Sequence, residues 1–320
     1  MFDITAMGEL LIDFAPVSTD ADGYPTMAAH PGGAPANFLA AVNMLGGKAA
    51  FMGKVGDDAF GKLLSATVKN AGIDTSALIL DPNYFTTLAF VTLDETGDRE
   101  FSFARKPGAD TQLSFEELDL SIIDNSRAFH FGTLSLTGEP ARTCTQKAVA
   151  YAKAQGKLIT FDPNLREPLW DDLEEAKKQI LWGLEQCDVV KISDNEVEFL
   201  FGCTPAEGAA KLMKDFDIKL AFVTLGPDGS LAINKKGSVC GGKLNCLPKI
   251  VDTTGAGDIF GGTAVREVLR ASAAPEELEG DELLNIVKLA CATASLSATR
   301  FGGISSVPTR EEVLELLAKQ

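Results

Sequence analysis

The segment DTTGAGDIFGG, at residues 252–262, places three small residues directly before a carboxylate. Apolar residues recur at helical spacing from Ile259 onward, so a strand-to-helix turn should precede this helix and comprise Gly255, Ala256 and Gly257. Unpaired backbone amides and the positive end of the helix dipole meet at such a turn. The turn can therefore bind a phosphate or a transient oxyanion.

Asp258 follows this turn and supports two interpretations. A carboxylate in the first helical turn is favoured by the dipole, and its role would then be structural. Alternatively, Asp258 takes a proton from a hydroxyl group while the amides of residues 255–257 stabilise charge on a transferring phosphoryl group. The segment alone does not decide between the two.

The elements that must position these residues follow an alternating pattern. Short apolar runs at 157–162, 187–193 and 218–226 are typical of buried strands, and the segments 139–156 and 171–186 have helical period. Alternating strands and helices predict an α/β fold with a mostly parallel sheet.

Two segments depart from that pattern. Residues 86–108 include apolar and polar residues in alternation on both sides of an Asp-Glu-Thr-Gly-Asp turn at 94–98, which is typical of a hairpin. Residues 13–33 are rich in turn residues and lack helical period. We expect the two segments to pair as a small β-layer within a single domain, 1–320. This layer is either a lid over a site or an ordinary excursion of the sheet edge.

Composition restricts the partners and the compartment. The net charge of −16, from 29 basic and 45 acidic residues, argues against nucleic acid or an anionic membrane, since both need a basic face. Six cysteines without a C-x-x-C pair and two histidines argue against a structural zinc site. The first 14 residues carry three acidic residues, unlike a signal peptide. No apolar run reaches the ~18 residues of a membrane helix, so we expect a cytoplasmic protein.

Several longer motifs resemble one known family. DTTGAGD and the stretch PGGAPANFLAAVNMLGG with FMGKVGDDAFG, within residues 31–61, resemble the two signatures of the ribokinase-like (PfkB) carbohydrate kinases. GELLIDF (8–14), DPNLREPLW (162–170) and VTLGPDGS (223–230) resemble segments of the fructokinases of that family, in the same order. The resemblance spans about residues 3 to 315. It implies a three-layer α/β/α core with a small β-sheet lid.

The resemblance also implies roles for individual residues. Asp258 would be the general base, and the amides of residues 255–257 would form the anion hole. The residues implied in sugar binding, besides Asp258, are Asp13, Gly32, Gly33, Asn37, Phe103, Arg105 and Arg166. Ala104 and Lys106 depart from the plant-type fructokinases, which have an aromatic residue and an asparagine at these positions. The departure weakens the assignment of the sugar substrate more than the assignment of the family.

ATP and Mg²⁺ are the implied cofactors. Asn195 and Glu198 form an N-x-x-E pattern, and their i, i+3 spacing places both side chains on one helix face. Alone this pattern is common on surface helices; the resemblance implies that it positions hydrated Mg²⁺ and phosphates. The resemblance also places Thr224, Gly226 and Gly229 near the phosphates and the ribose, with Gly257 at the anion hole.

The adenine ring is expected between residues 223–230 and the helix at 283–299. Members of the family often bind K⁺ beside the anion hole. The implied ligands are Asp252, the carbonyl of Thr254 and oxygens of the loop at 297–306. An ion site and a structural turn remain equally compatible with this loop.

We therefore predict an ATP-dependent sugar kinase that converts D-fructose to D-fructose 6-phosphate. A related kinase for 2-keto-3-deoxygluconate, ribose or a nucleoside is the main alternative, because Arg105 and Arg166 could recognise a sugar carboxylate. A non-catalytic sugar sensor is the alternative from another class. The resemblance further suggests a homodimer formed through the lid.

Overall fold

The structure is a computed structural model that describes residues 1–93, 99–244 and 249–320. Nine strands within these residues form a main sheet of order β13-β12-β11-β10-β9-β8-β1-β4-β5. The strands from β11 to β5 are parallel, whereas β12 and β13 form an antiparallel edge. The strands are β1 Phe2–Met7, β4 Ala49–Gly56, β5 Asp74–Asp81, β8 Ser126–Gly132, β9 Leu158–Asp162, β10 Val189–Ser193, β11 Leu220–Thr224, β12 Ser230–Asn234 and β13 Gly237–Gly241.

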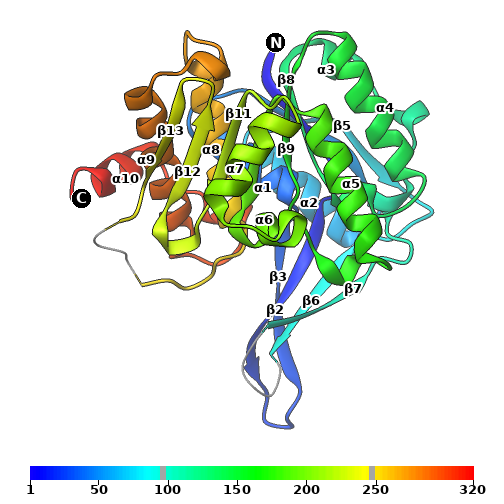
Figure 1. Ribbon diagram of the computed structural model, residues 1–320. Coiled ribbons are helices and arrows are strands. Elements are labelled where there is room, and N and C mark those ends of the chain that lie inside the picture. The colour runs from blue at the N-terminus through cyan, green and yellow to red at the C-terminus, as the bar shows by residue number, and fades with distance from the viewer. Residues whose placement is uncertain (94–98, 245–248) are drawn as a thin grey trace.

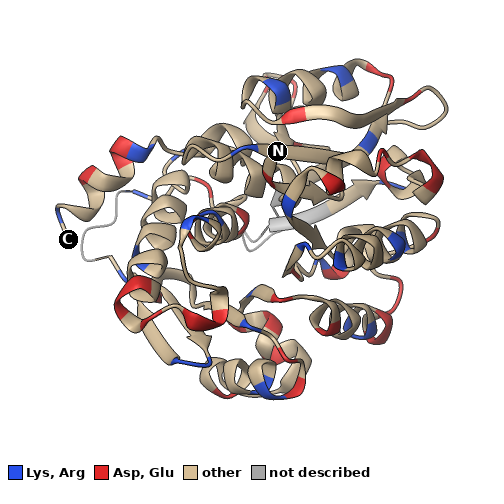
Figure 2. Cartoon of the chain, turned by 90° about the horizontal axis from the view of Figure 1, so that it is seen from above, with Lys and Arg blue, Asp and Glu red and all other residues tan. Residues whose placement is uncertain are grey.

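Helices cover both faces of this sheet, so the three-layer α/β/α fold predicted from the sequence is confirmed (Figure 1). One apolar cluster joins the sheet to α1 Ala34–Met44, α2 Ala59–Asn70, α8 Ala256–Arg270 and α9 Gly280–Ser297, and α10 Arg310–Leu317 packs on α9. The other cluster joins it to α3 Ser121–Asp124, α4 Ala141–Ala154, α5 Leu173–Gln186, α6 Asp194–Phe201 and α7 Pro205–Asp215. Acidic and basic positions are interspersed along the outer helices (Figure 2). In the parts of the chain that the structure describes, no helix is long and apolar enough to cross a membrane.

A second, four-stranded sheet has the order β3-β2-β6-β7. Its strands are β2 Leu11–Thr19, β3 Pro25–Gly32, β6 Leu88–Leu93 and β7 Arg99–Ala104. Asp13 lies opposite His30 in the antiparallel pair of β2 and β3, and opposite Ala89 in the parallel pair of β2 and β6. The two irregular segments of the sequence are therefore neighbours in space. The predicted turn at 94–98 lies outside the described residues.

The carboxyl ends of the parallel strands meet at one edge of the main sheet. β9, β10 and β11 end there at Asp162, Ser193 and Thr224, and Glu9 follows β1. The small sheet extends from the same edge, at the bottom of Figure 1. Ligands of open α/β sheets bind at this edge, and the residues singled out in the sequence gather there.

Candidate active site

The small-residue turn before Asp258 starts helix α8. Gly255 caps the helix with φ of 74°, a left-handed conformation that glycine adopts without strain. Asp258 lies in the first helical turn and is 6% exposed. The strand that the sequence predicted before this turn would precede residue 249, and residues 245–248 lie outside the described residues. Residues 249–253 belong to no helix or strand, and the amides of Val251 and Asp252 bond to the carbonyl of Ala298 at the end of α9.

Asn37 holds the Asp258 carboxyl group. Its Nδ2 donates to Oδ2 of Asp258 over 2.9 Å, because α1 and α8 pack together near their amino ends. Burial raises the pKa of Asp258, although the Asn37 bond and the charges of Arg166 and Lys191 oppose the shift. In the described part of the chain, the buried Oδ1 of Asn37 has no hydrogen-bond partner. It is therefore an acceptor that a ligand hydroxyl could satisfy.

Asp13, Gly32 and Gly33, which the sequence predicted to bind the sugar, lie close together at the start of α1. A Cβ on Gly32 would lie 2.4 Å from Oδ2 of Asp13, and a Cβ on Gly33 would lie 2.5 Å from the Glu9 carbonyl. Gly33, with φ of 124° and a backbone atom in the way, admits only glycine, whereas a side chain at Gly32 would displace the Asp13 carboxylate. Burial raises the pKa of Asp13 to about 6, and the nearby Arg166 charge opposes this shift. Asp13, Gly33 and Asn37 line one cleft of about 820 Å³, together with Asp258.

Glu9 is a residue of this cleft that the sequence reasoning missed. Its Oε1 accepts a hydrogen bond from the Ala34 amide over 2.8 Å, at the start of α1. Burial raises the pKa of Glu9 to about 7, and the backbone hydrogen bonds of Glu9 and Ala34 oppose the shift. Glu9 is the acidic residue of the GELLIDF segment. The sequence gives no sign of its contact with α1, which begins 25 residues later.

The two predicted sugar-binding arginines lie in different environments. Arg166 is exposed and lines the cleft, where its charge acts on Asp13 and Asp258. Arg105 is 6% exposed and lies outside the cleft lining. Its guanidinium donates to Asp110 Oδ2, Thr137 Oγ1 and the Leu134 carbonyl over 2.8 to 2.9 Å. This geometry does not support the sugar contact expected of Arg105 and gives it a structural position instead; Phe103 does line the cleft.

A buried ion pair lies beside the cleft, and its lysine, Lys191, belongs to the cleft lining. Nζ of Lys191, in β10, is 3.0 and 3.2 Å from the two carboxylate oxygens of Asp162 at the end of β9. Burial opposes the charge on Lys191, but the charges of Asp162, Glu196 and Asp258 outweigh this effect and raise its pKa. Neither residue of the pair was singled out in the sequence, because strands 29 residues apart bring them together.

The N-x-x-E residues are only partly at the cleft. Asn195 and Glu198 are both exposed on α6, but Asn195 lines the cleft and Glu198 does not. Glu196 does line it, is 7% exposed, and accepts from the Leu165 amide over 2.8 Å. Its other oxygen accepts from the Ser193 amide in a capping box. Glu196 was missed in the sequence, and the S-x-x-E spacing of Ser193 and Glu196 was the signal that could have identified it.

A second, apolar cavity of about 310 Å³ adjoins the cleft. Thr224, Gly226 and Gly229 line it, as do residues of α9 such as Cys291 and Ala294, in the region expected to hold adenine. Thr224, Thr253 and Gly257 line both spaces. The turn of residues 255–257 is therefore located where the polar cleft and the apolar cavity meet.

Asp252 connects the start of α8 to the loop at 297–306. Its Oδ1 accepts from the Thr254 amide and its Oδ2 from the Gly302 amide, each over 3.0 Å. Within residues 1–93, 99–244 and 249–320, no three His, Cys, Asp or Glu side chains are grouped to hold a metal ion. This is compatible with Mg²⁺, which keeps several waters and is bound largely through substrate phosphates.

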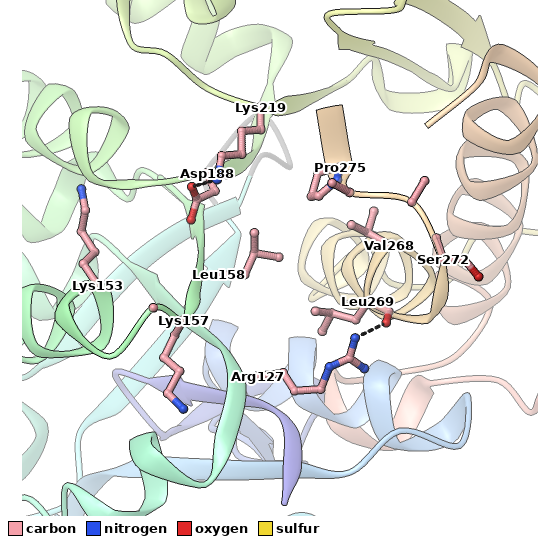
Figure 3. A pocket seen from close by; sticks show the side chains of 14 residues that line it. Arg127, Lys153, Lys157, Leu158, Asp188, Lys219, Val268, Leu269, Ser272 and Pro275 are labelled. Atoms are coloured by element: carbon pink, nitrogen blue, oxygen red, sulfur yellow. Dashed lines mark hydrogen bonds and ion pairs between the residues drawn. The ribbon is translucent and has the colours of Figure 1, made fainter. Parts of the chain in front are cut away.

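A third cavity, of about 560 Å³, lies near the amino ends of the strands, away from Asp258. Its basic lining residues already have protein partners. Figure 3 shows Arg127 bonded to the Leu269 carbonyl and Lys219 paired with Asp188. Lys153 and Lys157 donate to Gln186 and to the Asp124 carbonyl. The basic side chains of this cavity are therefore engaged within the protein.

The fold and the cleft are those of a carbohydrate kinase. Residues 1–310 match the pfkB family carbohydrate kinases, so the chain belongs to that family. Fructokinase-1 of Zea mays is 42% identical over 323 residues, covering 99% of this chain and 98% of that protein.

Solved structures agree with this assignment. Fructokinase from Xylella fastidiosa with bound ATP matches with a TM-score of 0.90 and 27% identity, covering 100% of this chain and 99% of that chain. A fructokinase double mutant from Vibrio cholerae O395, in a form with bound fructose, ADP and potassium ion, matches with a TM-score of 0.86 and 31% identity. That match covers 99% of this chain and 98% of the other.

Proposed function

We propose that this chain transfers the terminal phosphoryl group of ATP to D-fructose, giving D-fructose 6-phosphate and ADP. The observation that carries the proposal is the junction of the two cavities. Gly257 borders both of them, and Asp258, the next residue, lines the polar one. A sugar in the polar cleft and a nucleotide in the apolar cavity would meet at this point. Fructokinases of similar sequence and structure support fructose as the acceptor.

Asp258 acts in this proposal as the general base. Asn37 binds its Oδ2, which leaves Oδ1 to accept the proton of the sugar hydroxyl. Burial raises the pKa of Asp258 and makes it a stronger base. The amides of Gly255, Ala256 and Gly257 stabilise charge on the phosphoryl group during transfer. Because the transition state is loose, positioning and charge stabilisation contribute more than base strength.

Sugar recognition is assigned to the polar side of the cleft. Carboxylate and amide groups can accept from and donate to many hydroxyls, which suits a neutral polyol. The proposed sugar-binding residues are Asp13, Gly32, Gly33, Asn37, Phe103 and Arg166. Arg105 instead fixes the chain after β7 through its buried bond to Asp110.

Thr224, Gly226 and Gly229 are proposed to bind the nucleotide. Mg²⁺ bound with ATP would neutralise charge on the phosphates. Asn195 and Glu196 lie at the cleft and fit an outer position around a hydrated ion, and Glu198 lies one helical turn from Asn195. For this outer position around Mg²⁺, the geometry supports Glu196 more strongly than Glu198, because Glu196 lines the cleft and Glu198 does not.

We also propose a monovalent cation site for K⁺ at Asp252, the Thr254 carbonyl and the loop at 297–306. The support is that Asp252 bonds to both backbone segments and so fixes their separation. Replacing K⁺ by tetramethylammonium at constant ionic strength should lower kcat. Unchanged turnover would remove this part of the proposal.

The small sheet is proposed to act as a lid, within the single domain 1–320. Asp13, Val91 and Phe103 from three of its strands line the cleft, so its movement would open or close the sugar side. Its distal end exposes Val17 and Tyr24, which are 65% and 69% accessible. We propose that a second copy of the chain covers these residues in a homodimer. Sedimentation of the wild type and a Val17→Asp, Tyr24→Ser variant would test this.

A substrate panel with coupled ADP detection tests the proposed function. Fructose should give the highest kcat/KM, ahead of 2-keto-3-deoxygluconate, ribose and adenosine. The exposed Arg166 favours 2-keto-3-deoxygluconate as the second candidate, because a guanidinium can bind a sugar carboxylate. Fructose binding in calorimetry without ADP release would indicate a sugar sensor and overturn the assignment as a kinase.

A further inference from the structure

Lys191 is a buried cation in the middle of the main sheet. It lies in β10 between the parallel neighbours β9 and β11, and its side chain is 9% exposed. Val190 and Ile192 belong to the apolar cluster on the α4 to α7 side. Because strand side chains alternate between faces, Lys191 points to the opposite side, toward α8.

Asp162 anchors the ammonium group but does not use all of its donors. Both carboxylate oxygens of Asp162 accept from Nζ, and in the described residues the Lys191 ammonium has no other hydrogen-bond acceptor. An ammonium has three donors. Burying a charge is costly unless it is well compensated, so a partly satisfied lysine at this depth needs a reason.

The sequence of α8 makes room for this lysine at the anion-binding turn. Gly257 and Gly261 are four residues apart and therefore share one helix face. A Cβ on Gly257 would lie 3.0 Å from Nζ of Lys191, and a Cβ on Gly261 would lie 3.9 Å from its Cδ. The lysine thus runs along the glycine face of α8 and ends beside the turn that receives the phosphoryl group.

The acidic lining of the cleft favours a cation at that point. Among the described residues, six carboxylates line the cleft, namely Glu9, Asp13, Glu167, Glu196, Asp252 and Asp258. The lysines and arginines that line it are Lys191 and the exposed Arg166. The carboxylates would repel an entering polyphosphate, and Lys191 would add positive charge at the turn to that of the Mg²⁺ bound with ATP.

We propose that Lys191 is a catalytic residue of phosphoryl transfer, with its ammonium bonded to the transferring group beside Gly257 and with Asp162 as its positioning residue. This inference rests on the proposed function. The lysine gives up no proton. It stabilises charge on the phosphoryl oxygens while the bond from phosphorus to the ADP oxygen breaks and the bond to the sugar oxygen forms.

Three variants test the proposal with ATP and fructose: Lys191→Met, Asp162→Asn and the double variant. Lys191→Met should lower kcat by ~10² to 10³, the effect of removing one donor from a preorganised anion site. KM for fructose should change by no more than about threefold, since the interaction is made in the transition state. Asp162→Asn should give a smaller loss, because the ammonium remains but is less well held.

The double variant separates catalysis from stability. Removing both charges leaves no unpaired buried ion, so its Tm should recover toward that of the wild type. Its kcat should stay as low as that of Lys191→Met. A kcat within threefold of wild type in any soluble variant lacking Lys191 would refute the proposal.

Lys54→Met is the matched control, because Lys54 is also a buried lysine paired with carboxylates but lies outside the cleft lining. It should lose stability and retain kcat. If wild-type protein phosphorylates no sugar of the panel, the proposed function fails. If wild-type protein is active and Lys191→Met matches it, only this inference fails.

Discussion

The two buried lysines, Lys54 and Lys191, occupy similar depths but differ in how their ammonium groups are satisfied. Nζ of Lys54, in β4, donates to Asp81 over 3.0 Å, to Glu117 over 2.6 Å and to the Gln112 carbonyl over 3.0 Å. These acceptors use its three donors. Nζ of Lys191 is bonded to Asp162 and faces the glycine turn of α8.

This difference separates a structural charge from one available to a ligand. The Lys54 cluster joins the carboxyl end of β4 to residues 112–117, and all its groups are engaged within the protein. The Lys191 cluster is incomplete on the side where the polar cleft and the apolar cavity meet. Burial and ion pairing are common to both, so the number of acceptors and the position at the cleft distinguish Lys191 from Lys54.

The largest effect on stability is expected at Lys54. Lys54→Met leaves Asp81 and Glu117 without their cation, and breaking a buried pair in this way costs about 3 to 5 kcal/mol. Denaturant unfolding measures the loss, and kcat at a temperature well below Tm should remain near wild type. Normal stability would show that this cluster is less tightly paired than its geometry indicates.

Gly257→Ala tests how closely the Lys191 ammonium approaches the turn at the start of α8. The added Cβ would lie 3.0 Å from Nζ of Lys191, so the ammonium or the turn must shift. A shift of a few tenths of an ångström near the reacting groups should lower kcat, by less than the ~10²-fold that a misplacement of about 1 Å costs. Gly261→Ala is the control, since its Cβ would meet Phe38 at 3.5 Å, an ordinary contact. Equal kcat values for the two variants would contradict the close approach of Lys191 to the turn.

The two regions should respond to pH with opposite sign. Burial raises the pKa of Glu9, in the cleft, from 4.5 to about 7, so the folded state loses stability as pH rises from about 4.5 to 7. The pKa of Asp81 is lowered: burial opposes the shift, but bonds from Asn83 and Lys54 outweigh it. Its stabilisation is present above its unfolded pKa and is lost as pH falls through the folded value.

Thermal unfolding between pH 3 and 8 checks these signs. Glu9→Gln should raise Tm relative to wild type at pH 8, with the gain disappearing near pH 4.5. Asp81→Asn should lower Tm at pH 8, with the penalty shrinking in acid. Parallel pH curves for wild type and both variants would contradict the assigned shifts.

The smallest expected effects concern the two glutamates of α6. Glu196→Gln should raise the Mg²⁺ concentration for half-maximal activity by about tenfold, as outer-sphere groups of metal sites do. Glu198→Gln should have a smaller effect, because Glu198 lies outside the cleft lining. A larger effect of Glu198→Gln than of Glu196→Gln would instead support the role in Mg²⁺ positioning that the N-x-x-E pattern predicts for Glu198.

Local signals explain what the sequence could predict. The glycine turn before Asp258 and the alternation of strands and helices depend on neighbouring residues, so the helix start and the fold class were predictable. The spacing of Gly33 and Asn37 likewise depends on the start of one helix, α1. Residues 13–33 and 86–108 both break the alternation of strands and helices, and for that reason we could predict that they pair in space.

Contacts between distant segments explain what could not be predicted. Arg105 alternates with Phe103 in sequence, yet its guanidinium is bonded to Asp110, Thr137 and Leu134 instead of facing the cleft. Lys191 appeared as one polar residue in an apolar strand. Its partner Asp162 and the glycines beside it come from β9 and α8, so only the assembled sheet identifies it.

The most direct test of the central claim is turnover of Asp258→Asn with ATP and fructose. The variant should keep the wild-type circular dichroism spectrum and bind both substrates in calorimetry, because asparagine can keep a hydrogen bond with Asn37. We expect kcat to fall by ~10² to 10⁴, the contribution of a positioned general base. A folded variant with kcat within twofold of wild type would remove Asp258 from the reaction and contradict the account.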